Sequence, residues 1–155
     1  MSLSLEFYAG DADKIGAAFS ESEFECLRDG SLARVYADLS LHISSTDLDI
    51  LSEQAAGLLK RPPIRLLDLL LRNVGGVPDE SSADVVASEW VELMAAVPES
   101  EASTLSGVWL SAVMAESGEE IDTRNPDAAK AIADLLALCR WAKANNATVV
   151  FAWYL

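Results

Sequence analysis

Hydrophobic and polar residues alternate in two stretches of the first half of the chain, which is the pattern of β-strands with one buried face. The first runs over residues 3–8. The second has two opposed sets of alternating residues: Val35, Ala37, Leu39, Leu41 and Ile43 against Tyr36, Asp38, Ser40 and His42. The last stretch, 148–155, is apolar throughout and rich in β-branched and aromatic residues, which predicts a strand buried on both faces and central in its sheet.

Between these strands, apolar residues recur at helical spacing. The pattern predicts a helix starting at Asp11, a short turn around Phe24 and Leu27, and five further helices. Those five cover residues 46–60, 63–74, 85–97, 105–118 and 126–145, and the stretch 77–82 is the clearest loop. Paired Pro62-Pro63 and Gly75-Gly76 bound the helix predicted over 63–74.

The predicted order of elements is β, α, β, several α, then β, without the regular alternation of a doubly wound sheet. It favours an α+β fold: a small sheet of about three strands, with about six helices packed mainly on one face and with the N- and C-terminal strands both in the sheet. A length of 155 residues is typical of one domain, so residues 1–155 are expected to form a single α+β domain.

Charge is the most unusual global property: 11 Lys and Arg against 25 Asp and Glu give a net charge of −14. Such a surface repels nucleic acids and anionic membranes, attracts basic proteins, and also keeps a protein soluble. Hydrophobic residues make up 51% of the chain, which is enough for a core that forms without a cofactor. No basic segment leads into an apolar run at the N-terminus and no window is long and apolar enough to span a membrane, so neither a signal peptide nor a membrane span is expected.

The two cysteines, Cys26 and Cys139, lie in apolar helical patterns and lack the spacing of a metal or redox motif. They are expected to be small buried residues, which is consistent with a reducing cytoplasm.

Three segments resemble a family of uncharacterised bacterial cytoplasmic proteins, a domain of unknown function. Residues 3–8 lead into 13–15, the apolar run from Leu67 ends at Gly75-Gly76, and residues 138–146 lead into 149–151. The similarity covers under a third of the chain, and the motifs are packing motifs. The resemblance therefore implies a fold and no activity.

A candidate polar site lies on the second predicted strand, where Tyr36, Asp38, Ser40 and His42 share one face. His42 is the only histidine, and its side chain titrates near neutral pH. Alternate residues of a strand stand about 7 Å apart, so Ser40, His42 and Asp38 cannot form the short hydrogen bonds of a catalytic triad. A surface histidine is therefore the favoured interpretation, with no catalytic residue assigned.

The polar stretch 116–125 carries the second candidate site, an acidic cluster formed by Glu116, Glu119, Glu120 and Asp122. It lacks the ligand spacing and the glycine of a calcium loop, so no metal is expected. Asp13, Asp47 and Asp49 are instead explained by helix first turns, where negative charge is favourable.

The leading hypothesis is a non-catalytic binding protein, similar in role to an immunity protein or antitoxin, whose acidic cluster contacts a basic protein. A small enzyme or ligand-binding domain around His42 is the first alternative, and a structural homo-oligomer is the second. The chain is expected to be a monomer or a weak homodimer.

Overall fold

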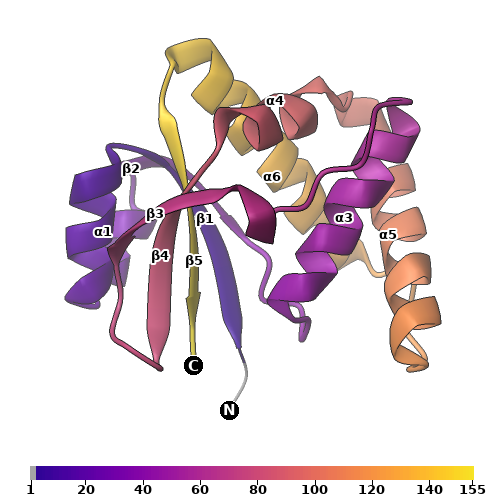
Figure 1. The fold of residues 1–155 in the computed structure, drawn as a ribbon, viewed down its shortest axis with the longest axis horizontal. Coiled ribbons are helices and arrows are strands. Elements are labelled where there is room, and N and C mark those ends of the chain that lie inside the picture. The colour runs from indigo at the N-terminus through magenta and orange to yellow at the C-terminus, as the bar shows by residue number, and fades with distance from the viewer. Residues whose placement is uncertain (1–2) are drawn as a thin grey trace.

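A computed structural model describes residues 3–155, apart from the side chain of Arg34. One five-stranded antiparallel sheet has the order β2-β1-β5-β4-β3 (Figure 1). Its strands are β1 (Ser4–Gly10), β2 (Ala33–Asp38), β3 (Leu70–Gly75), β4 (Ser81–Val86) and β5 (Thr148–Tyr154). The α-helices within the described residues are α1 (Ala12–Ser20), α2 (Phe24–Arg28), α3 (Ser45–Leu58), α4 (Ser88–Ala96), α5 (Ala102–Ser117) and α6 (Pro126–Asn145). Two short 3₁₀ turns, η1 (Leu67–Leu69) and η2 (Glu99–Glu101), precede β3 and α5.

The fold is α+β, but the prediction of a three-stranded sheet is wrong, because β3 and β4 form a hairpin that joins the sheet. The apolar residues between Leu67 and Val74 recur at a spacing that fits a helix, yet the chain there forms η1 and β3. Val85 and Val86 likewise end β4, and α4 begins only at Ser88. By periodicity alone, a short apolar run fits either a helix or a strand. Here the hydrogen-bonded pairing of β3 with β4 makes both runs strands.

The strand β5 lies in the centre of the sheet, as its uninterrupted apolar sequence predicts. It pairs with β1 along its whole length, from Ser4 opposite Tyr154 to Gly10 opposite Thr148. The start of β1 and the end of β5 consequently lie side by side at one end of the sheet (Figure 1).

Helices cover both faces of the sheet (Figure 1). The larger core, which contains Phe7 and Phe151, packs against α3, α4, α5 and α6. The smaller core, which contains Tyr8 and Val150, packs against α1 and α2. Successive residues of β1 therefore belong to different cores, as the two-residue period of a strand requires.

Capping residues set the ends of the long helices. The Ser44 and Asp47 side chains form a capping box at α3, and the Asn125 side chain accepts a hydrogen bond from the Asp127 amide at the start of α6. At the other ends, Gly118 and Asn146 adopt left-handed backbone conformations after α5 and α6. These signals are local, and the boundaries of α6 agree with the sequence prediction.

The helix α1 approaches β3 through two glycines, Gly16 and Gly75. A Cβ atom placed on Gly16 would stand 2.6 Å from the carbonyl carbon of Val74 and closer still to its oxygen. The Ser20 hydroxyl of α1 donates to the Gly16 carbonyl and accepts from the Gly76 amide at 2.9 Å. Backbone therefore packs directly on backbone at this crossing.

The strand β2 is shorter than predicted. It ends at Asp38, whose carboxylate accepts a hydrogen bond from the Ser40 amide at 2.9 Å, and the following residues leave the sheet. The prediction of a continuous strand from Val35 to Ile43 is therefore wrong.

Among residues 3–155, no helix is both long enough and apolar enough to span a membrane.

Candidate functional site

Four carboxylates border a groove of about 550 Å³ between α3 and α5. Asp47, Asp49 and Glu53 come from α3, and Glu116 comes from the end of α5. Among the residues that the structure describes, Arg65 is the only basic one that borders it. We call this surface the α3–α5 groove.

Three of these four carboxylates already form a hydrogen bond or an ion pair within the protein. Asp47 accepts a hydrogen bond from the Ser44 amide at 2.9 Å, and Asp49 accepts one from the Leu67 amide at 3.0 Å. Glu53 pairs with Arg65 at 3.3 Å. Glu116 is exposed and forms no hydrogen bond or ion pair with any residue in the described part of the chain. Negative charge therefore exceeds positive charge along the groove.

The sequence-predicted acidic cluster divides between two surfaces. Glu116 borders the α3–α5 groove, whereas Glu119, Glu120 and Asp122 are exposed on the loop that follows α5. The Asp122 carboxylate also accepts a hydrogen bond from the Arg124 amide at 3.0 Å. The groove adds Asp47 and Asp49, which sequence reasoning had explained by a helix first turn, and Glu53, which it had not singled out.

Three of the residues predicted for the polar site gather at a groove of about 380 Å³ between β2 and α6. Tyr36, Asp38 and Ser40 line it together with Asp127, Lys130 and Asp134 of α6. His42 does not line this groove; it lies in the loop after β2, exposed, with a positive φ of 60°. The structure therefore separates the histidine from the other members of the predicted site.

Side chains in this groove mostly serve local structure. The Ser40 hydroxyl accepts a hydrogen bond from the Leu5 amide at 3.1 Å, and the Asp38 carboxylate accepts one from the Ser40 amide. Lys130 pairs with Asp134 at 2.8 Å, and this hydrogen bond raises the pKa of Lys130. Burial, and then the Asp38 carboxylate, raises the pKa of Tyr36. A raised pKa keeps the Tyr36 hydroxyl protonated at neutral pH, so this phenol is not activated as a nucleophile.

A buried carboxylate on the face of the sheet that α1 and α2 cover was missed by sequence reasoning. Glu6 of β1 is 1% exposed and forms an ion pair with Arg28 of α2. The Tyr8 hydroxyl donates to Glu6, and the Tyr154 hydroxyl donates to it at 3.2 Å. Arg28 also donates to the Tyr154 hydroxyl at 2.9 Å and lies 5.4 Å from the centre of the Phe24 ring. We call these residues the Glu6 network.

The Glu6 network has only a partial signature in the sequence. Glu6 and Tyr8 occupy alternate positions, so a shared strand face was visible. The pairing of β1 with β5 brings Tyr154 close to Glu6, and Arg28 comes from α2, which packs on the same face of the sheet. Each polar side chain of the network bonds to at least one other member, which is characteristic of a structural element.

The Glu6 network makes stability depend on pH in alkaline solution. Burial, and then the hydrogen bond to Glu6, raises the pKa of Tyr8 well above its ordinary value of 10.0. Above that pH the unfolded chain loses the Tyr8 proton while the folded chain keeps it, so the free energy of unfolding falls as pH rises. We expect Tyr8→Phe to reduce this slope by up to about 1.4 kcal/mol per pH unit, measured by urea unfolding between about pH 9 and 11. Equal slopes in the two proteins would contradict the pKa shift.

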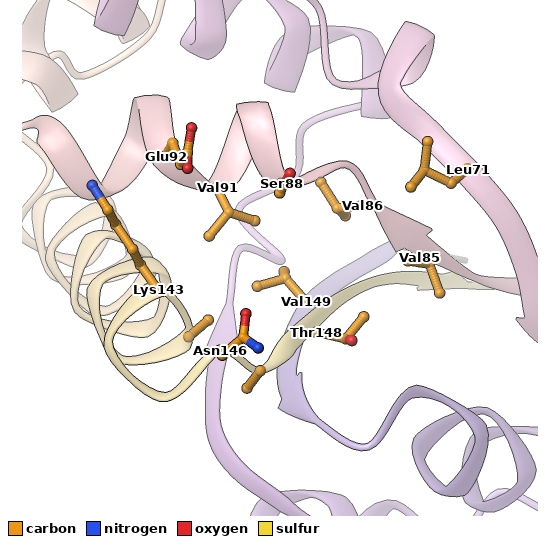
Figure 2. A pocket seen from close by; sticks show the side chains of 12 residues that line it. Leu71, Val85, Val86, Ser88, Val91, Glu92, Lys143, Asn146, Thr148 and Val149 are labelled. Carbon is orange, nitrogen blue, oxygen red and sulfur yellow. The ribbon is translucent and has the colours of Figure 1, made fainter.

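An apolar pocket of about 350 Å³ lies where α4 and the end of α6 meet the sheet (Figure 2). Its buried valines come from β4, α4 and β5, and polar side chains such as Lys143 and Glu92 stand at its rim. Leu71 of β3 forms one wall and is 66% exposed. This pocket depends on Leu71 of β3 and on Val85 and Val86 of β4, which the sequence pattern had assigned to helices.

No protein-family model, curated protein or solved structure matches this chain. The family resemblance drawn from the termini and the segment from Leu67 to Gly76 stays a prediction. Among residues 3–155, no three His, Cys, Asp or Glu side chains gather closely enough to hold a metal ion.

Proposed function

We propose that this protein is a non-catalytic binding protein that holds a basic protein partner in the α3–α5 groove, in the manner of an immunity protein or antitoxin. The observation that carries this proposal is the convergence of Asp47, Asp49, Glu53 and Glu116 on one groove that a single arginine borders. The exposed loop acids Glu119, Glu120 and Asp122 follow α5 directly and extend the acidic surface.

Electrostatics supports an extended basic partner. Carboxylates on two separate helices present several acceptors along a groove, which matches several Lys or Arg side chains of one surface. The net charge of −14 adds long-range attraction that accelerates encounter. In this proposal the protein acts in a reducing cytoplasm, and both cysteines are free thiols.

Binding of a lysine-rich peptide tests this proposal. We expect the double variant Glu53→Gln, Glu116→Gln to bind the peptide roughly fivefold more weakly. The variant removes two groove charges, and Arg65, which then lacks its partner Glu53, repels the peptide. Titration calorimetry at low and at physiological salt measures the effect, and binding of the unaltered protein should weaken as salt screens the charges.

A matched control separates the groove from net charge. The double variant Glu25→Gln, Glu89→Gln changes exposed acids on α2 and α4 and lowers the negative charge by the same two units. We expect this control to bind the peptide nearly as tightly as the unaltered protein. If both double variants weaken binding equally, the acidity is only solubilising and the proposal is wrong.

A further inference from the structure

A second polar groove, independent of the proposed function, holds an unpartnered buried hydroxyl. It measures about 390 Å³ and lies between α5 and the loop leading into α6. Ser106 of α5 borders it and is 2% exposed, and its Oγ has no hydrogen-bond partner in the part of the chain that the structure describes. Because a buried hydroxyl without a partner destabilises the fold, Ser106 points to a ligand that bonds to it.

Most of the other residues that border this groove carry hydrogen-bond donors on their side chains. Ser103 and Ser111 come from the same helix as Ser106, and Thr123 and Arg124 come from the loop. Gly107 has no side chain, and a Cβ there would stand 3.8 Å from the Thr123 carbonyl oxygen. The groove is therefore polar and lined in part by hydroxyl groups.

One cationic side chain, that of Arg124, lies at one end of the groove. Arg124 and Asn125 immediately precede α6, whose N-terminus carries the positive end of the helix dipole. Arg124 forms no ion pair within residues 3–155, and a cation beside a helix N-terminus is unfavourable unless an anion balances it. Asp127, the acid in the first turn of α6, lines the groove on the β2 side instead.

We propose that this groove binds a small phosphorylated molecule, with its phosphoryl oxygens on Arg124 and the hydroxyls of Ser103, Ser106 and Thr123. Hydroxyl donors, an arginine and a helix N-terminus are the groups that bind phosphoryl oxygens in proteins. The volume is at the small end of ligand pockets, which suits a phosphate carrying a short organic group. The loop acids Glu119, Glu120 and Asp122 do not line the groove.

Glycerol 3-phosphate, inorganic phosphate and glycerol are the probes for this site. In NMR titrations of the whole chain, we expect glycerol 3-phosphate to shift the amides of residues 103–111 and 121–125 saturably, inorganic phosphate to bind more weakly, and glycerol to cause no shift. Loss of one charge-assisted contact in Arg124→Gln should weaken binding about tenfold. Arg61→Gln, an exposed arginine elsewhere, should leave it unchanged.

Ser106→Ala separates a binding role from a purely structural one. Without ligand, removal of an unpartnered hydroxyl should leave the melting temperature unchanged or raise it, while affinity for glycerol 3-phosphate falls. The proposal is overturned if no saturable shift appears at millimolar ligand. It is also overturned if Arg124→Gln and Arg61→Gln weaken binding equally, or if Ser106→Ala binds as tightly as the unaltered protein.

Discussion

Replacing Gly16 by Ala is expected to lower the free energy of unfolding by about 3 kcal/mol. The new Cβ would stand 2.6 Å from the carbonyl carbon of Val74, below the 3.0 Å that real Cβ contacts respect. Neither side yields easily, because Val74 belongs to β3, which pairs with β4, and Gly75 faces Gly16 just as closely. The better helix propensity of Ala recovers only about 1 kcal/mol. Urea unfolding followed by circular dichroism measures the loss.

Gly57→Ala is the matched control for this substitution. Gly57 lies in the last turn of α3, and a Cβ there meets no atom within 4 Å. The same chemical change should therefore stabilise the protein, by about 0.5 kcal/mol. If Gly16→Ala unfolded at the same urea concentration as Gly57→Ala, the backbone contact between α1 and β3 would not exist as described.

The elements that sequence reasoning located correctly carry their own boundary signals. The helix α6 begins at Asn125-Pro126 and ends at Asn146, and β5 is an apolar run between polar residues, so local chemistry sets both. The hairpin of β3 and β4 has no such signal, because its apolar residues also fit a helical stripe. Leu71, 66% exposed on the edge strand, would have been a core residue of that helix.

The candidate sites were harder to foresee than the fold, because each joins residues that are far apart in the chain. Glu116 was singled out by its acidic neighbours, but the carboxylates that share its groove come from α3. The local role of Asp47 and Asp49 at a helix N-terminus was visible, and the position of these carboxylates opposite α5 was not. His42 was paired with Ser40 by strand periodicity, and the early end of β2 removed that relation.

Replacing Arg28 by Met is expected to lower the free energy of unfolding by about 3 kcal/mol, because it leaves the Glu6 carboxylate buried without its counter-ion. The value is at the low end for such a change, since the Tyr8 and Tyr154 hydroxyls still donate to Glu6 and Arg28 is itself 38% exposed. Arg72→Met is the matched control. Its ion pair with Asp13 is exposed on both sides, so its loss should cost under about 1 kcal/mol.

Adding Glu6→Gln to Arg28→Met distinguishes an unpaired charge from lost packing. Removing both charges leaves neutral groups that the two tyrosines still satisfy, so the double variant should recover about 2 kcal/mol of the loss seen in Arg28→Met. Chemical unfolding of the four proteins of this cycle at neutral pH gives the coupling energy between Glu6 and Arg28. A double variant no more stable than Arg28→Met would mean that Arg28 stabilises the fold through its contacts with Phe24 and Tyr36 and not through the buried carboxylate.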